Sequence, residues 1–188
     1  MGSTHAMQRS ARGWTLVELM LALVILVTTL VLGTPVMQSF VQGNRLWGAS
    51  SRFLLALSLA RSEAILRNRT VSICPSSFYR TRLARCSGTY ADGWIVFTNA
   101  SRDRVIDDAT DTVLRGFEGL PLGYAVANRL GTRAVSTLIN FNPDGTANVN
   151  RTLRFCPPQS ASRASISIVL NMVGRARLYQ DVAGCSLG

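Results

Sequence analysis

A long apolar segment near the N-terminus constrains this chain more than any other feature of its sequence. The run from Trp14 to Val36 contains one charged residue, Glu18, and it has no charge at all between Leu19 and Leu32. It meets the length of about 20 residues that a membrane-spanning helix requires. We therefore expect a membrane helix here, followed by about 150 residues, which suffice for one compact domain.

The residues before this run indicate how it would be processed. An ordinary secretory signal peptide has basic residues first, then an apolar core, and then a small residue at the cleavage site. Here the small residue, Gly13, comes before the core and directly after Arg9 and Arg12. A cut after Gly13 would leave Trp14 as the new N-terminus of an intact apolar helix. The basic leader favours a cytoplasmic location for this end, although two arginines beyond the run weaken the charge difference.

Glu18 lies inside the apolar segment, where an ionised carboxylate costs roughly 2.5 to 3.5 kcal/mol on insertion scales and needs a partner. After cleavage, the free amine of Trp14 would lie about one helical turn away, and the helix N-terminus adds positive potential. The amine of a neighbouring copy could pair with Glu18 when such helices pack together away from water. The alternative is that Glu18 simply lies in the headgroup region.

The segment RGWTLVELM, residues 12–20, resembles the leader junction and helix start of type IV pilins and type II secretion pseudopilins. The family pattern has glycine before the cut, usually phenylalanine after it, and then T-L-[IV]-E-[LM]; this chain has Trp14 instead of phenylalanine. The resemblance implies cleavage after Gly13 by a prepilin peptidase, N-methylation of Trp14, and insertion from the inner membrane into a helical filament of pilins. Pro35 stands where many pilins also have proline and should kink or loosen the helix.

Beyond Pro35 the sequence stays helical but becomes amphipathic. Its apolar residues recur at steps of three, four or seven, which is typical of a helix with one buried face: Leu46, Phe53, Leu57, Ala60 and Ala64. The helix should end near Asn68. We thus expect four regions, namely a leader (1–13), the apolar half of the helix (14–36), its amphipathic half (37–68) and a β-rich globular domain (69–188).

Short β-rich runs separated by turn residues follow the helix. The candidates are residues 70–74, 93–99, 112–117, 134–141, 151–156 and 165–170. The segment FNPDGTA, residues 141–147, predicts a tight turn in which Pro143 fixes φ and Gly145 takes the left-handed conformation. We therefore expect an α+β fold, a mainly antiparallel sheet packed on the long helix. This turn and the segment ARSEAILRN, residues 60–68, are similar to the FimT/GspH group of minor pilins and pseudopilins, which implies the type IV pilin-like fold.

The chain has four cysteines, all beyond the apolar segment: Cys74, Cys86, Cys156 and Cys185. No C-x-x-C motif and no nearby histidine supports a metal site. An even number of cysteines after an export segment favours disulfides in an oxidising compartment. Sequence neighbours are the expected pairs, Cys74 with Cys86 and Cys156 with Cys185, although four cysteines allow three connectivities and buried thiols are the alternative.

The sequence does not predict an enzyme, a cofactor or a metal site. The only histidine, His5, precedes the apolar segment, and all 20 basic residues are arginines. Nucleophile and base pairs need a group that titrates near neutrality, and the mature chain has neither histidine nor lysine for that role. The acidic run that contains Asp103, Asp107, Asp108 and Asp111 lacks the residue order of a calcium loop, so we interpret it as a solvated turn.

Positive charge is concentrated late in the chain. From residue 129 to residue 188 there are seven arginines against two aspartates. If residues 175–179 are extended, Arg175, Arg177 and Tyr179 share one face. Two such arginines are roughly 6.5 to 7 Å apart along a strand, which suits neighbouring phosphates of one nucleic-acid strand. Contacts of this kind are independent of base sequence.

The motif GRAR, from Gly174 to Arg177, resembles the G-R-x-R motif that FimT-type minor pilins place near the C-terminus to bind DNA during natural transformation. The resemblance implies a DNA-binding site at Gly174, Arg175 and Arg177. We expect Arg154 and Arg163 to be secondary contacts. The alternative is an ordinary edge strand whose charges discourage aggregation.

These observations predict a minor type IV pilin that binds extracellular DNA without sequence preference. It would be a single-pass inner-membrane protein with a periplasmic domain before it enters a pilus or pseudopilus at the cell surface. The alternative function is purely structural: a FimU-like minor pilin or a GspH-like secretion pseudopilin that initiates or caps the filament.

Overall fold

The computed structural model describes residues 13, 15–107, 109–158, 165–181 and 184–186. The chain forms two compact units, Met1–Gln38 and Ser39–Gly188. We call the second unit the head. The helix α1, Leu16–Arg67, has residues in both units.

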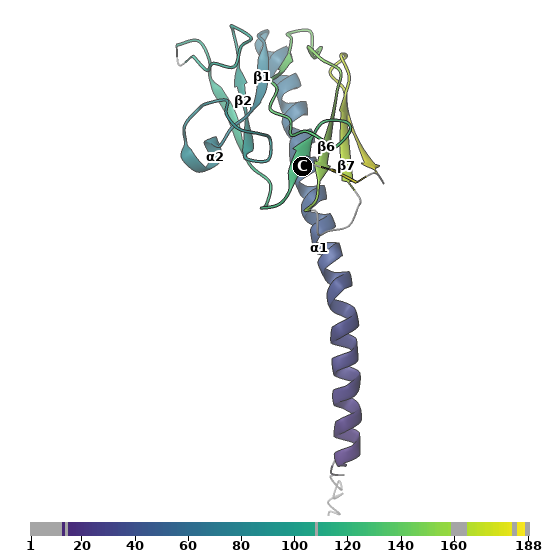
Figure 1. Ribbon diagram of the computed structural model, residues 1–188. Helices are drawn as coiled ribbons and strands as arrows, with labels where there is room; N and C mark the ends of the chain where they lie inside the picture. The colour runs from purple at the N-terminus through teal and green to yellow at the C-terminus, as the bar shows by residue number, and fades with distance from the viewer. Residues whose placement is uncertain (1–12, 14, 108, 159–164, 182–183, 187–188) are drawn as a thin grey trace, which may run out of the picture. The chain divides into compact units, whose positions relative to one another are not determined.

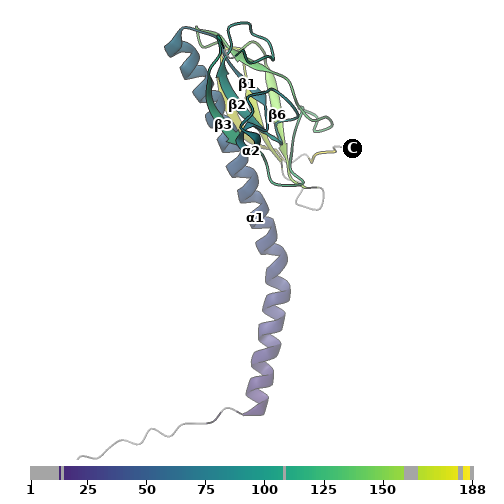
Figure 2. The same cartoon turned by 90° about the vertical axis from the view of Figure 1, so that its left-hand side faces the viewer.

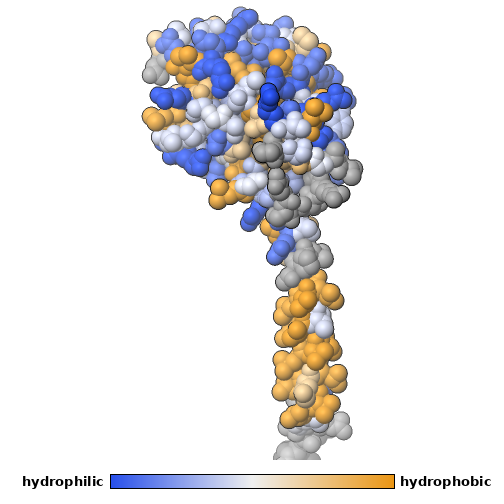
Figure 3. Space-filling view, viewed as in Figure 1, coloured by the Kyte–Doolittle hydropathy of each residue, from blue (hydrophilic) through white to orange (hydrophobic). Residues whose placement is uncertain are grey.

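The first unit carries the apolar half of α1. Every side chain from Leu16 to Leu32 is exposed, and together they form an almost continuous apolar surface (Figure 3). Within the described residues, α1 is the one helix long and apolar enough to cross a membrane. The hydroxyls of Thr28 and Thr29 donate hydrogen bonds to helix carbonyls at 2.8 to 2.9 Å, which removes two polar groups from this surface. The segment therefore matches a membrane anchor.

The head contains the amphipathic half of α1. One face of this half is buried, as the spacing predicts: Leu46, Ala49, Phe53, Ala56, Leu57, Ala60 and Ala64. The Glu63 carboxylate pairs with Arg67 Nε at 2.5 Å on the exposed side. The helix ends at Arg67, and Asn68 follows it with a left-handed φ of 50°.

Two antiparallel sheets complete the head (Figures 1 and 2). The first has the strand order β3-β2-β1-β5 and is formed by β1 Val71–Pro75, β2 Gly93–Thr98, β3 Val113–Glu118 and β5 Ile139–Phe141. The second has the order β4-β6-β7-β8 and is formed by β4 Ala125–Ala127, β6 Arg151–Cys156, β7 Ser165–Leu170 and β8 Ala176–Asp181. A single-turn helix, α2 Phe78–Thr81, follows β1.

The α+β fold and most of its elements were predictable, and the differences have local reasons. The candidate strand 134–141 is too long, because only its end forms β5. Its start bonds to β4 of the other sheet instead, through an isolated bridge of Ala134 to Ala127 and a hydrogen bond from the Val135 amide to the Val126 carbonyl. The strand β4 was missed, since three residues give too short a pattern to detect. The turn before residue 147 is present, with Gly145 at φ +79° and its amide bonded to the Asn142 carbonyl at 2.9 Å.

Phe53 joins the helix to both sheets at the centre of the core. Its ring lies 5.1 Å from those of Tyr90 and Trp94 and 5.7 Å from that of Phe155, each in an edge-to-face arrangement. Trp94 belongs to β2 in the first sheet, whereas Phe155 belongs to β6 in the second. One aromatic cluster therefore joins α1, the first sheet and the second sheet. Aromatic pairs of this geometry stabilise a fold by more than the burial of their apolar area alone.

Two disulfides connect the cysteines as sequence neighbours. Cys74 is bonded to Cys86, and Cys156 is bonded to Cys185. The first closes a loop around α2, and the second ties the last described residues to the end of β6. Each disulfide therefore fixes a segment that contains little helix or strand.

Tyr90 makes the stability of the head sensitive to alkaline pH. Its hydroxyl lies 2.8 Å from the Thr137 carbonyl and 3.1 Å from the Ile73 carbonyl, and burial raises its pKa above the ordinary value of 10.0. The folded state thus holds this proton more tightly than the unfolded chain. Stability should be unaffected by this group below pH 10 and fall by about 1.4 kcal/mol per pH unit above it.

We expect Tyr90→Phe to abolish this alkaline decline while lowering stability near neutrality by about 1 kcal/mol, the value of one hydrogen bond. Urea unfolding of the full chain in a neutral detergent, measured from pH 7 to pH 11, tests this. The chain has no lysine whose titration would obscure the effect. Equal alkaline slopes for the parent and the variant would contradict the assignment.

Candidate nucleic-acid interface

The hairpin turn between β7 and β8 presents the GRAR motif. The Gly174 amide donates a hydrogen bond of 2.9 Å to the Asn171 carbonyl, and the Arg175 amide donates one of 2.8 Å to the side-chain oxygen of Asn171. The Asn171 amide in turn donates to the Arg175 carbonyl at 3.1 Å. These hydrogen bonds fix the backbone of the turn and therefore the position of Arg175, the first arginine of the motif.

Gly174 is required at its position for two reasons. Its φ of +78° lies in the left-handed region, and a Cβ there would collide with the Gly145 carbonyl oxygen. The same carbonyl accepts a hydrogen bond of 3.0 Å from Arg61 Nε on α1. The turn at Gly174, the turn at Gly145 and the helix therefore meet at one point, and the role of Gly174 is to permit this contact.

The strand β8 separates its side chains as the sequence predicts. Arg175, Arg177 and Tyr179 are exposed, whereas Ala176 and Leu178 are partly buried and pack against the core. The strand lies at the edge of the second sheet and pairs only with β7 among the described strands. Arg177 lies in β8 and Arg175 directly precedes its first residue, so the two exposed arginines are close together at the start of the edge strand.

A groove of about 890 Å³ runs between the exposed flank of α1 and the start of β8. Its apolar side chains include Leu54, Leu55 and Ile65, and three arginines border it: Arg61, Arg175 and Arg177. The residues that line it include no carboxylate. An anion that enters the groove therefore meets three positive charges without a competing acid.

Arg61 is the residue that the sequence reasoning missed. Nothing in its local sequence distinguishes it from the other arginines of the helix. Only the approach of the turn at Gly145 brings it to the groove, through the bond to the Gly145 carbonyl. A contact between residues 84 positions apart has no local sequence signal.

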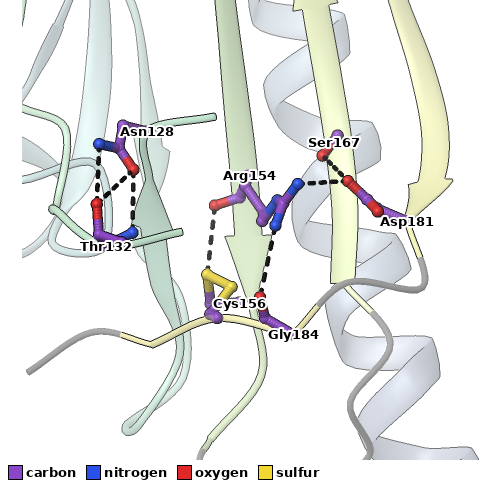
Figure 4. A network of polar contacts seen from close by, with 8 residues as sticks. Asn128, Thr132, Arg154, Cys156, Ser167, Asp181 and Gly184 are labelled. Carbon is purple, nitrogen blue, oxygen red and sulfur yellow. Dashed lines mark hydrogen bonds and ion pairs between the residues drawn. A yellow bond between two sulfur atoms is a disulfide. The ribbon is translucent and has the colours of Figure 1, made fainter. Parts of the chain in front are cut away.

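Arg154 does not belong to this surface, contrary to the expectation from sequence. Its side chain is only 10% exposed, its Nη2 pairs with Asp181 Oδ2 at 2.5 Å, and its Nη1 donates to the Gly184 carbonyl at 3.4 Å. Figure 4 shows this network between β6, the end of β8 and the last described residues. A guanidinium that is buried and already paired cannot reach a phosphate. Arg154 instead forms an ion pair with Asp181, the last residue of β8, and so neutralises the negative charge at this end of the strand.

The other predicted site residues divide by whether the structure describes them. Arg163 and Trp14 lie outside the described residues. Gly13 and Glu18 belong to the first unit, and both are exposed. Within the described part of the chain, no group of three or more histidine, cysteine, aspartate or glutamate side chains could hold a metal ion.

Comparison with known proteins finds one matching family model and several solved structures of similar fold. A family model described as type II transport protein GspH matches residues 49–174. The type IV minor pilin FimU of Pseudomonas aeruginosa is similar in structure, with a TM-score of 0.54 and 21% identity over 74% of this chain and 92% of that one. A second crystal form of FimU gives a TM-score of 0.51 and 20% identity, over 71% of this chain and 92% of that one.

The minor pseudopilin EpsH from the Type 2 Secretion System of Vibrio cholerae matches with a TM-score of 0.42 and 18% identity, over 70% of this chain and 93% of that one. No curated protein matches the sequence significantly. The matched family region ends at Gly174, directly before Arg175 and Arg177.

Replacement of Gly174 by alanine tests the three-way contact. The left-handed φ and the collision with the Gly145 carbonyl oxygen should together lower the free energy of unfolding by about 2 to 4 kcal/mol. Thermal or urea unfolding of the full chain in neutral detergent measures this. Gly43→Ala is the matched control, because a Cβ at Gly43 on α1 meets open space. Equal losses for the two variants would show that the contact at Gly174 is unimportant.

Proposed function

The chain belongs to the GspH family of minor pilins and pseudopilins, and from this premise we propose that its head binds DNA without sequence preference. The proposed ligand is extracellular DNA, held through its phosphate backbone for uptake in natural transformation. The binding residues are Arg175 and Arg177, with Gly174 as the residue that allows the turn. Association with other pilins in a filament follows from the family.

One observation carries the proposal: Arg175 and Arg177 are both exposed at the start of an edge strand, and together with Arg61 they line a groove whose lining residues include no carboxylate. The planar guanidinium fork matches the oxygens of a phosphate in two places, which an ammonium does not. Arginines two apart on a strand match the spacing of successive phosphates to within about an ångström or two. The geometry therefore suits the backbone of a polynucleotide rather than a single small anion.

The anchor supports this function by presenting the head outside the membrane. We propose that a prepilin peptidase removes residues 1–13, that Trp14 is N-methylated, and that residues 14–36 span the inner membrane with the head in the periplasm. The Glu18 carboxylate would then pair with the N-terminal amine of a neighbouring subunit during assembly. That pairing offsets the cost of placing an acid among apolar side chains.

The competing function is a filament subunit that binds no DNA, as in a FimU-like or GspH-like structural role. The position of β8 at a sheet edge favours this alternative, because charged side chains on an edge strand discourage pairing with another chain. In that case the arginines would protect the edge, and their identity as arginines would be unimportant.

Exchange of both arginines for glutamine separates the two functions. We expect Arg175→Gln combined with Arg177→Gln to weaken binding of unrelated duplexes about equally, and to reduce the slope of log K against log salt by about 2, since each lost phosphate contact removes about 0.9. Fluorescence anisotropy with the full chain in neutral detergent, at several salt concentrations, measures both quantities.

The matched control is Arg102→Gln combined with Arg104→Gln, which removes the same charge from exposed positions in a loop that also carries Asp103 and Asp107. The two double variants should differ if the motif is a specific site. Identical affinities and slopes would reject the site and favour the structural function.

The role of Glu18 is tested in cells by assembly rather than by binding. We expect Glu18→Gln to be processed normally but to enter filaments poorly, because the amide cannot form the ion pair with the amine of a neighbour. Gly13→Val is the contrasting variant, which should stay unprocessed because the residue before the cut is altered. Immunoblots of membrane and sheared-filament fractions measure both steps, and normal incorporation of Glu18→Gln would refute the pairing.

A further inference from the structure

The loop closed by the disulfide Cys74–Cys86 carries a second group of arginines. We call residues 79–85, with the sequence YRTRLAR, the cationic loop; all seven are exposed. It contains Arg80, Arg82 and Arg85 and no acidic residue. We propose that the cationic loop is a second phosphate-backbone binding site for nucleic acid, separate from the GRAR motif.

The loop is held rigidly although it is short of regular structure. The disulfide closes its base, and the Ser76 hydroxyl donates to the Arg85 carbonyl at 2.7 Å while accepting the Phe78 amide at 3.2 Å. The Arg82 amide donates to the Phe78 carbonyl at 2.8 Å. The backbone that carries the arginines is thus ordered before binding, which reduces the entropy lost when a ligand is bound.

Contact with the first sheet fixes the loop on the head. The Phe78 ring lies directly over Gly116 of β3, where a Cβ would approach the ring within 2.5 Å. Glycine at this position in the strand therefore lets α2 lie flat against the sheet. The backbone of the loop is therefore fixed on the head by packing and by the disulfide.

The positive charges of the loop are largely uncompensated. Among the described residues, the only ion pair to the loop joins Arg80 Nη2 to Asp92 Oδ1 at 4.0 Å. The other oxygen of Asp92 already accepts hydrogen bonds from the amide and hydroxyl of Thr89. Arg82 and Arg85 are exposed without a carboxylate partner in the described part of the chain, so they are available to an anionic ligand.

Nucleic acid fits this loop better than a lipid surface does. Interfacial binding to a membrane depends on buried apolar area as well as on attraction to anionic headgroups. The arginines attract either polyanion, but the loop offers a membrane only one large aliphatic side chain, Leu83. A single leucine contributes only about 1.5 to 3 kcal/mol. Tyr79, 48% exposed beside Arg80, can stack on an unpaired base, a contact that lipid headgroups do not offer.

The loop and the GRAR motif lie on different sides of the head. The loop follows β1 and rests on β3 in the first sheet, whereas GRAR begins β8 in the second. In Figure 1 α2 lies on the opposite side from the yellow strands, and in Figure 2 it faces the viewer with those strands behind it. One head would therefore offer two separate surfaces to polynucleotide, and it could hold two segments of DNA.

The inference rests on the proposed affinity of the head for DNA, but not on the assignment of that affinity to Arg175 and Arg177. The test uses the full chain in neutral detergent, with a short duplex and a single strand as probes. The loop variant is Arg80→Gln, Arg82→Gln and Arg85→Gln together. The control variant is Arg69→Gln, Arg102→Gln and Arg104→Gln, which removes three exposed charges elsewhere on the head.

We expect the loop variant to bind the duplex roughly 5- to 30-fold more weakly than the control variant and with a salt slope lower by roughly 2 to 3, since each lost phosphate contact removes about 0.9. Exchange of the three loop arginines for lysine should restore most of the affinity, because the charge is kept. In the background of Arg175→Gln and Arg177→Gln, the residual binding should disappear when the loop variant is added. Unchanged melting temperatures would show that the loop variant is folded.

The outcomes distinguish this inference from the proposed function. If the loop variant binds like the control variant, the loop serves another ligand, such as anionic lipid, and the inference is overturned. If the exchange of Arg175 and Arg177 has no effect while the loop variant loses affinity, the GRAR assignment fails and the loop site stands. If the parent chain binds no DNA at all, both are refuted.

Discussion

The packing of Phe53 against Tyr90, Trp94 and Phe155 is the interaction on which the head depends. It fixes the amphipathic half of α1 against both sheets at once, because the three aromatic partners come from both sheets and from the loop before β2. The position of the helix in turn decides where Arg61 lies, and Arg61 meets the Gly145 carbonyl only when the helix is seated on the core. A central apolar contact therefore determines the shape of a charged groove at the surface.

The fold was largely predictable because its signals are local and strong. The apolar run, the amphipathic spacing from Leu46 to Ala64 and the β-rich runs each depend on neighbouring residues only, and the structure contains the corresponding helix and most of the strands. The predictions that failed concern a very short strand and a segment whose conformation is set by tertiary contacts. The strand β4 has three residues, and residues 134 and 135 bond to β4 of the other sheet instead of extending β5.

The site was less predictable than the fold, since charge alone does not show which arginines face water. In sequence, Arg154 and Arg177 both alternate with apolar residues along a strand. In the structure, Arg154 is buried and bonded to Asp181 at the end of β8 and to Gly184 beside the disulfide-bonded Cys185, whereas Arg177 stays exposed on the edge strand. These partners lie 27 and 30 residues away along the chain, so no local pattern predicts their effect.

The head contains no lysine and no histidine, so its positive charge comes from arginine alone. Every cation between residue 39 and residue 188 is a guanidinium, which stays protonated at any physiological pH. Under the proposed function, salt would act on each phosphate contact through the release of condensed counterions. We therefore expect ionic strength, and not acidity, to govern the binding of polyanions by a head whose cations are all guanidinium groups.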